Sequence, residues 1–410
     1  MPSIAIIGAG ITGVTTAYQL LNRGYDVTLF ERQRYAAMET SYANGGQLSA
    51  SNAEVWNHWS SILKGIKWMV QPGAPLLLNP MPSYHKYAWM TEFLLAMRNY
   101  RGNTVATVRM ALEARAELLR IAEDEGLDFA LEKRGILHIY RQKQSYDHAL
   151  RVNELLAEGG LDRRAVTPEQ IQTIEPTVKG ALHGGFFTES DMTGDINEFT
   201  AQLEAVCERK GMKAQFNSEI LELKKLKEGG VEVRTVENGS ERFDGVVVCS
   251  GVSSRKFASQ LGDRLNVYPV KGYSITVNLR DDADRAAAPW VSMLDDETKI
   301  VASRLGEDRF RVAGTAEING FSRDIRQARI DPLLDWCQEL FPGMSTRSYV
   351  PWAGLRPMMP NMMPVVRAGN APGVFYNTGH GHLGWTLSAA TSSLVADLVN
   401  ARLAAQRVCR

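Results

Sequence analysis

The 410-residue sequence has few cysteines, no excess of either charge and no long apolar run. Its four cysteines are scattered and form no C-x-x-C pair, which argues against a zinc site and against a disulfide framework. Lys and Arg number 46, as do Asp and Glu, whereas a nucleic-acid-binding protein normally carries a basic excess. We therefore expect a protein of a reducing compartment, with no nucleic-acid partner and no metal site.

No uncharged apolar stretch reaches the roughly 18 residues that a membrane-spanning helix needs. The first residues, MPSIAIIGAG, also lack the basic lead and cleavage site of a signal peptide. These absences predict a soluble cytoplasmic protein that is at most peripheral on the inner face of the cell membrane.

What the sequence does contain is a dinucleotide-binding start. Apolar runs at residues 3–7 and 26–31 predict two parallel strands, with a glycine turn and a helix between them. In the turn, G-x-G-x-x-G allows a tight bend, close approach of the backbone to a pyrophosphate, and close packing of the helix. The helix N-terminus favours the phosphate charge. The expected cofactor contacts in this turn are Gly8, Ala9, Gly10, Ile11, Thr12 and Gly13.

An acidic residue stands where the ribose of a dinucleotide would lie. Glu31 ends the second strand, 18 residues after Gly13, and Arg32 follows it. A carboxylate at this place accepts hydrogen bonds from a ribose diol and would repel a 2′-phosphate, so NADP is disfavoured. A glycine turn without a nucleotide is the weaker alternative, because both strands, the helix and the acid are in place.

A second G-x-G-x-x-G, formed by Gly379, Gly381 and Gly384, follows an apolar strand near the end of the sequence. Only 26 residues follow Gly384, and they predict one helix without a second strand or a ribose acid. We therefore expect this turn to bring a helix N-terminus to another part of the same cofactor. A long cofactor held near residues 8–31 and again near residue 380 favours FAD over NAD.

Sheet-and-helix insertions separate the nucleotide-binding pieces, so two interleaved domains are expected. The fold class is α/β, with a Rossmann-like FAD-binding domain and an α+β substrate domain. The FAD-binding domain is expected at residues 1–55, 186–265 and 345–410, and the substrate-binding domain at 56–185 and 266–344. Helices are predicted at 104–126, after the strand at 135–140 as far as about residue 158, at 197–211 and at 323–341. Strands are predicted at 135–140, 219–226, 231–236, 243–251 and from 268 onwards.

Five stretches, in matching order and spacing, resemble the D-amino-acid oxidase and glycine oxidase superfamily of FAD flavoproteins: TSYANGGQLSAS, SDMTGDINEFT, YPVKGYS, AGLRPM and NTGHGHLGWT. Within it, the sequence resembles the D-amino-acid dehydrogenases of the small-chain type. The resemblance implies a mainly antiparallel sheet above the flavin. It implies oxidation of a D-amino acid to an imino acid, which hydrolyses to a keto acid, with electrons passing to a quinone.

The resemblance also implies which residues hold the cofactor. The loop after the first unit lines the pyrophosphate and flavin, one backbone position holds the adenine side, and the C-terminal turn reaches the pyrimidine edge of the flavin. These residues are Ser41, Asn44, Gly45, Gly46, Gln47, Leu48, Ile220, Cys249, Ser250, Gly251, Gly354, Gly379, His380, Gly381, His382, Leu383, Gly384, Trp385 and Thr386.

The catalytic candidates are Arg356 and Tyr273. Arg356 lies in the Gly-Leu-Arg-Pro motif and is expected to clamp the substrate carboxylate, because a guanidinium pairs bidentately with it; the alternative is a structural ion pair. Tyr273 is expected either to face the substrate or to be a half-buried strand tyrosine. His380 and His382 could be bases, but hydride transfer to flavin N5 needs none, so packing against the flavin and substrate is favoured.

After Arg356 the sequence differs from the family pattern, because methionines replace an acidic turn: Met358, Met359, Met362 and Met363. They are expected either to pack on neighbouring protein or, for Met359 in particular, to line the substrate pocket. A further aromatic segment has apolar residues at helical spacing and two lysines, which predicts either a membrane-surface helix or one packed on the protein. Its residues are Trp56, Trp59, Leu63, Lys64, Ile66, Lys67 and Val70.

Three other functions stay open from the residues alone. One is an oxidase that passes electrons from glycine, sarcosine or another amino acid to oxygen. Another is a non-catalytic FAD-binding subunit. The third is a hydroxy-acid dehydrogenase, because an arginine holds any α-substituted carboxylate.

Overall fold

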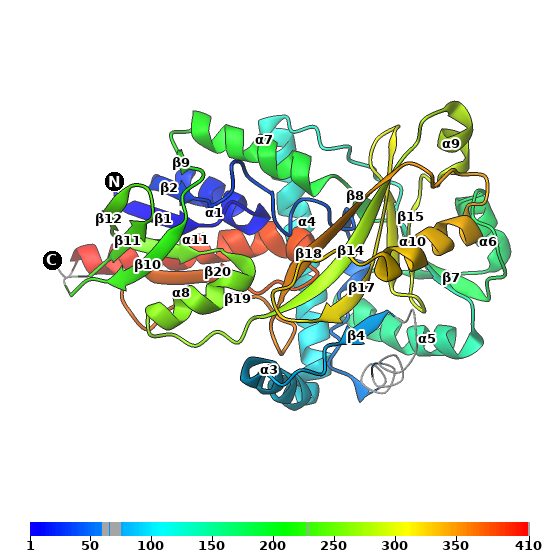
Figure 1. The fold of residues 1–410 in the computed structure, drawn as a ribbon, viewed down its shortest axis with the longest axis horizontal. Coiled ribbons are helices and arrows are strands. Elements are labelled where there is room, and N and C mark those ends of the chain that lie inside the picture. Colours follow the sequence, from blue (N-terminus) through cyan, green and yellow to red (C-terminus); the bar gives the residue numbers. More distant parts are fainter. Residues whose placement is uncertain (60–64, 66–74, 228, 409–410) are drawn as a thin grey trace.

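The computed structural model describes residues 1–59, 65, 75–227 and 229–408, and two large sheets organise this part of the protein (Figure 1). In the first sheet, neighbouring strands are parallel except for the antiparallel edge strand β19. Strands β13 and β20 are buried along their whole length, which explains the apolar residues that make up β13 and the first part of β20. In sheet order, the strands are β19 (Val365–Ala368), β20 (Val374–Thr378), β13 (Gly245–Val248), β1 (Ser3–Ile7), β2 (Asp26–Phe30) and β9 (Lys213–Gln215).

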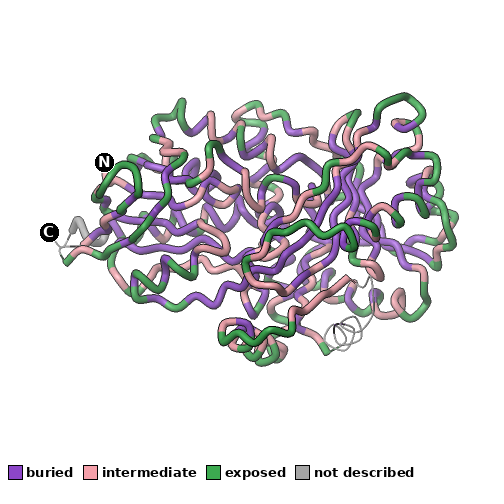
Figure 2. The backbone as a smooth tube through the Cα atoms, viewed as in Figure 1, coloured by how far each residue is buried: buried purple, intermediate pink, exposed green. Residues whose placement is uncertain are grey.

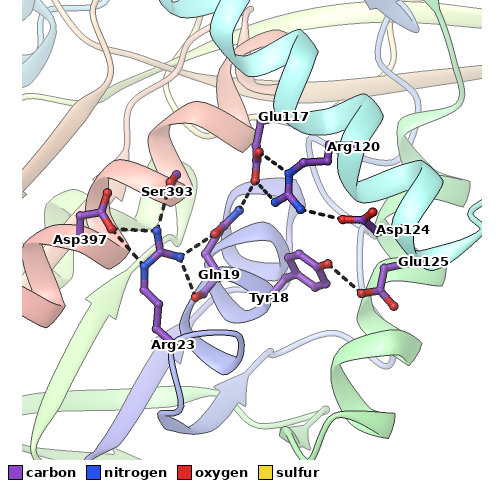
Figure 3. Close-up of polar contacts among 9 residues, drawn as sticks. All are labelled: Tyr18, Gln19, Arg23, Glu117, Arg120, Asp124, Glu125, Ser393 and Asp397. Atoms are coloured by element: carbon purple, nitrogen blue, oxygen red, sulfur yellow. Dashed lines mark hydrogen bonds and ion pairs between the residues drawn. The ribbon is translucent and has the colours of Figure 1, made fainter.

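Four helices share one apolar core with this sheet. Polar contacts also join them: Tyr18 Oη donates to Glu125 at 2.7 Å, and Arg23 Nη2 donates to Asp397 at 2.8 Å (Figure 3). The first contact ties α1 to α4, although α4 lies in the range expected for the substrate domain. The helices are α1 (Ile11–Leu21), α4 (Tyr100–Glu125), α7 (Ile196–Arg209) and α11 (Gly384–Val408).

The second sheet is mainly antiparallel, as the resemblance implied, and α10 (Gln327–Leu340) packs on its apolar face. Only β15 with β5 and β17 with β4 are parallel pairs among the described strands of this sheet. In sheet order, its strands are β18 (Tyr349–Met358), β14 (Tyr268–Asn278), β17 (Arg309–Ile318), β16 (Ile300–Arg304), β15 (Ser292–Asp295), β5 (Ile136–Tyr140), β7 (Gly184–Thr188) and β6 (Arg164–Val166), with β4 (Leu76–Leu78) beside β17.

The pairing of β18 moves one expected domain boundary. Residues from 345 onwards were expected in the FAD-binding domain, but β18 pairs with β14 over ten residue pairs. The strand that carries Arg356 therefore belongs to the substrate-domain sheet, and the nucleotide-binding part resumes only with β19. Apolar periodicity predicts that a strand exists, but it does not say which sheet the strand joins.

The remaining elements surround these sheets. Most expected helices and strands are found, although α10 begins at Gln327 rather than near residue 323. The others are β3 (Gln47–Leu48), α3 (Tyr84–Leu95), α5 (Lys143–Glu158), α6 (Pro168–Ile174), β8 (Met192–Thr193), β10 (Ile220–Lys225), β11 (Val231–Thr235), β12 (Gly239–Phe243), α8 (Ser254–Gln260) and α9 (Asp282–Ala287), with short 3-10 turns at Ala50–Asn52, Ala96–Asn99 and Gly251–Ser253.

The predicted aromatic helix falls mostly on residues 60–64 and 66–74, which lie outside the described residues. Trp56 is not helical in the structure, and its ring stacks on His382 at 4.7 Å. Nearby, α3 carries exposed residues, whereas the strands of both sheets are largely buried (Figure 2). Among the described helices, none combines the length and the apolar character needed to cross a bilayer.

Candidate active site

The first glycine turn is shaped as a nucleotide-binding turn requires. Gly8 has a φ of +104°, a conformation that side chains other than hydrogen disfavour. A Cβ on Gly13 would lie 1.8 Å from the carbonyl oxygen of Gly8, so only glycine lets α1 start this close to β1. Ser41 Oγ accepts a hydrogen bond from the Ile11 N–H at 3.1 Å, which fixes the following loop at the helix N-terminus.

The carboxylate of Glu31 is held at the end of β2 by two backbone donors. The N–H groups of Ala9 and Gln33 each donate to one of its oxygens at 2.9 Å. Both oxygens keep lone pairs that a ribose diol could use. Arg32 instead forms an ion pair with Glu39 at 2.6 Å on the outer side of this site.

The loop at residues 43–46 is held against the second sheet. Ser274 and Ser303, on strands of the second sheet, donate to the carbonyls of Ala43 and Gly45 at 2.8 and 2.7 Å. A Cβ on Gly45 would lie 2.6 Å from the Val301 side chain, so the sheet approaches this loop too closely for any other residue. The loop therefore has a fixed shape where the flavin ring is expected.

One cavity of about 810 Å³ joins the nucleotide turn to the Gly-Leu-Arg-Pro motif. Of the expected site residues, Ala9, Gly13, Leu48 and Met359 do not line it, although Ala9 and Gly13 shape the turn beside it. The structure brings the others together around the cavity: Gly8, Gly10, Ile11, Thr12, Glu31, Arg32, Ser41, Asn44, Gly45, Gly46, Gln47, Ile220, Cys249, Ser250, Gly251, Tyr273, Gly354, Arg356, Gly379, His380, Gly381, His382, Leu383, Gly384, Trp385 and Thr386.

The start of α11 faces this cavity with two neutral histidines beside it. His380 Nε2 lies 2.9 Å from Thr391 Oγ1, and burial lowers the pKa of His380 to about 3. Burial, helped by the charge of Arg356, lowers the pKa of His382 to about 3 as well. Both rings are therefore uncharged at neutral pH and are weak bases, which favours the packing interpretation over a catalytic one.

The side chain of Arg356, on β18, extends over the neighbouring strand β14. A Cβ on Gly272 would lie 2.3 Å from Arg356 Nη2, so the absent side chain makes room for the guanidinium. Nη1 donates to the carbonyl of Thr315 at 2.9 Å, and burial lowers the pKa of Arg356 to about 10. The group is thus still charged at neutral pH. No carboxylate in the described part of the protein pairs with it, so the alternative of a structural ion pair finds no partner there.

The residue that receives Arg356 is itself strained. Thr315 has a φ of +59°, which a β-branched residue rarely adopts, and its buried hydroxyl has no hydrogen-bond partner among the described residues. Strain of this kind is typical of functional sites, where the surrounding structure holds an unfavourable conformation in place. It positions the carbonyl that orients the arginine.

Tyr273 does not share the face of Arg356. In the pairing of β14 with β18, Val270 lies opposite Arg356 and Tyr273 opposite Ala353. Since side chains alternate along a strand, Tyr273 points to the other face of the sheet. There its hydroxyl donates to Glu317 at 2.6 Å. This placement favours the strand-tyrosine interpretation over the expected catalytic and substrate-binding role, although Tyr273 is also among the residues that line the cavity.

The methionine loop mostly packs on protein. Met359 packs against Gly379 outside the cavity lining, and Met362 joins a buried cluster with Trp89 and Val55. Met358 does line the cavity, with its carbonyl accepting from Trp89 Nε1 at 2.8 Å. The placement of Met359 gives no support to its expected contact with the substrate.

Comparisons with known proteins decide the family. A model of the family described as FAD dependent oxidoreductase matches residues 3–398. The chain belongs to this family. D-amino acid dehydrogenase 3 of Mesorhizobium japonicum is 57% identical, covering 99% of this chain and 100% of the relative. D-amino acid dehydrogenase of Paramagnetospirillum magneticum is 39% identical, covering 97% and 95%. The fold is similar to that of glycine oxidase from Geobacillus kaustophilus, with a TM-score of 0.77, 20% identity, and 98% and 96% of the two chains covered.

The cavity of this FAD-dependent oxidoreductase fits the cofactor. Two helix N-termini and the Glu31 carboxylate suit a pyrophosphate and a ribose. Two buried polar atoms of the lining, Gln47 Oε1 and Trp385 Nε1, lack hydrogen-bond partners within the described residues, as expected where a polar cofactor completes the site. Glu31, Gln47 and the α11 turn would hold FAD, which supplies a two-electron acceptor. The resemblance stated from the motifs is confirmed.

Several lining residues of the oxidoreductase could not be found from the sequence. Met358 and Trp56 belonged to segments that had been singled out, but neither was expected at the cofactor cavity. The others lie on the second sheet or its connections, where no motif marks them: Glu54, His138, Tyr140, His148, Arg163, Asp296 and Lys299.

Proposed function

We propose that this FAD-dependent oxidoreductase is a D-amino acid dehydrogenase. The observation that carries the proposal is Arg356, a half-buried guanidinium that lines the cofactor cavity without a carboxylate partner among the described residues. An α-carboxylate is the planar, bidentate ligand that such a group selects. The two relatives named above support the D configuration and the dehydrogenase activity.

Each part of the site then has a role. Arg356, oriented by the Thr315 carbonyl, holds the substrate carboxylate and so fixes the α-carbon. FAD, when bound, would supply the two-electron acceptor for the α-hydrogen of the substrate. The resulting imine would be hydrolysed by water to a keto acid and ammonia. The N-terminus of α11 faces the cavity, where its dipole stabilises negative charge that develops during reduction.

We propose a quinone as the acceptor, reached from the membrane surface. The outer face of α3 supports this, because Tyr84, Tyr87, Leu94 and Leu95 are exposed there, Tyr84 by 87%. Exposed aromatic and aliphatic residues on one helix suit the bilayer interface. Co-sedimentation with anionic vesicles, coupled to quinone reduction, should weaken in Tyr87→Glu with Leu95→Glu. Rapid reoxidation of the reduced flavin by oxygen, with no quinone reduction, would instead identify an oxidase.

Replacement of the arginine tests the proposed substrate clamp. We expect Arg356→Gln to retain FAD but to lose roughly a hundredfold or more in kcat/KM for D-amino acids, since a lost partner of a buried charge pair costs about 2–5 kcal/mol. Arg347→Gln, an exposed arginine just before β18, is the matched control and should change nothing. Near-normal kinetics in Arg356→Gln would refute the clamp.

A further inference from the structure

A second set of charged side chains lines the same cavity, and neither the FAD-binding motifs nor the proposed oxidation uses it. Arg163 lies just before β6, Tyr140 ends β5, and Lys299 lies in the turn between β15 and β16. Two carboxylates, Glu54 and Asp296, line the cavity with them. The group comes from the second sheet and from the loop before residue 60.

Arg163 is a buried cation that forms no ion pair with any described residue. Its exposed fraction is 6%, and its guanidinium lies over the Phe186 ring at 4.5 Å. Nη2 makes one long hydrogen bond to Tyr140 Oη, at 3.3 Å, and Nε has no hydrogen-bond partner within the described residues. No carboxylate in the described ranges forms an ion pair with it. Because a buried charge is costly unless it is paired, this guanidinium is set up to receive an anionic group.

Lys299 presents its ammonium to the cavity from an unfavourable backbone conformation. Its φ is +55°, a region that L residues other than Asn and Asp seldom adopt. The side chain lines the cavity and is 44% exposed, and Nζ pairs with Asp296 at 2.5 Å. Glycine would fit the backbone of this turn better than lysine. The presence of a lysine here is therefore explained by its side chain and not by the turn.

The cations follow the order of the strands in the second sheet. Arg356 donates to the Thr315 carbonyl on β17, and β16, β15 and β5 follow β17 in that sheet. Lys299 directly precedes β16, and Tyr140, which Arg163 contacts, ends β5. Lys299 therefore stands between the substrate clamp and Arg163 in this order, and all three side chains line the same cavity.

We propose that Arg163, Lys299 and the Tyr140 hydroxyl bind a second carboxylate, so that the preferred substrate is an amino acid with an acidic side chain. The inference rests on the proposed function, which assigns the α-carboxylate to Arg356. Together, Arg356, Arg163 and Lys299 are three cations beside two carboxylates, Glu54 and Asp296, so a substrate with a net charge of −1 balances them. A neutral side chain leaves the Arg163 guanidinium uncompensated.

The test compares acids with their isosteric amides under anaerobic conditions. Flavin reduction is measured with D-aspartate against D-asparagine and with D-glutamate against D-glutamine. We expect one acid to exceed its amide by roughly tenfold or more in kcat/KM, because charge-assisted hydrogen bonds are the stronger ones. Arg163→Gln should abolish that ratio while D-alanine stays within about twofold, and Arg163→Lys should restore part of it. Arg164→Gln, an exposed neighbour that stacks on Phe187, is the matched control.

A binding measurement gives a readout that does not depend on turnover. Glutarate and pentanoate have equal chain lengths, and their perturbation of the oxidised flavin spectrum gives Kd. Wild type should bind glutarate roughly tenfold more tightly, and Arg163→Gln should not. Equal preference for acid and amide in the wild type, or equal losses on both in Arg163→Gln, would overturn the inference. If no amino acid reduces the flavin but glutarate still discriminates Arg163, the proposed oxidation fails and the anion site stands.

Discussion

The substitution Gly272→Ala should disturb substrate binding by Arg356 while changing the free energy of unfolding little. A Cβ at this position would lie 2.3–2.6 Å from three atoms of the Arg356 guanidinium. Ordinary contact between such atoms is about 3.5 Å, so the guanidinium must move by roughly 1 Å. Gly272 does not need a positive φ, and the atoms that must move are the far end of a flexible side chain. The free energy of unfolding should therefore change by less than about 1.5 kcal/mol.

The same displacement should damage the reaction far more. It moves the carboxylate clamp away from the Thr315 carbonyl, and an error of about 1 Å in substrate position can cost roughly a hundredfold in rate. The assay is anaerobic flavin reduction over a range of D-amino acid concentrations, with urea unfolding of the same preparations. Gly102→Ala is the control, because a Cβ there has no neighbour within 4 Å. If Gly272→Ala keeps kcat/KM within about threefold, the geometry assigned to Arg356 is refuted.

Two further predictions concern the cofactor turn and the histidines. Gly13→Ala should lower the FAD content of the purified protein sharply, because its Cβ would lie 1.8 Å from the Gly8 carbonyl oxygen. That oxygen belongs to the backbone, which cannot move aside as a side chain can. Full flavin occupancy would contradict this prediction. His380 and His382, with pKa values lowered to about 3 by burial, bind fewer protons when folded than when unfolded between pH 3 and the ordinary value of about 6.5. The free energy of unfolding should therefore fall as pH drops from about 6.5, by up to about 1.4 kcal/mol per unit and histidine, and His382→Phe should lessen that slope in urea titrations.

Local signals in the sequence predicted the nucleotide end well. The G-x-G-x-x-G turn, Glu31 and the final helix each follow from residues close together in the sequence, where apolar runs and glycines report directly on backbone geometry. The contacts of Glu31 with Ala9 and Gln33 then supply the fixed carboxylate that the motif implied. The helix expected after the second glycine turn is also present, since α11 begins at Gly384.

The substrate end was predicted less well, because it depends on pairings between distant strands. Tyr273 follows a recognisable motif, but its direction is set by the register of β14 against β18. Arg163 and Lys299 have no local pattern at all, and only the assembly of the second sheet brings them to the cavity that holds Arg356. The position of Met359 could not be predicted for the same reason, since it packs on Gly379, which belongs to a different segment of the sequence.

The most direct test of the account is anaerobic mixing of the purified, FAD-loaded protein with a panel of D-amino acids, their L enantiomers and their carboxamides. We predict that at least one D-amino acid bleaches the flavin band completely, while its L enantiomer and its carboxamide, which lacks the carboxylate for Arg356, do not. Full reduction by the carboxamide, or by no D-amino acid at all, would contradict it.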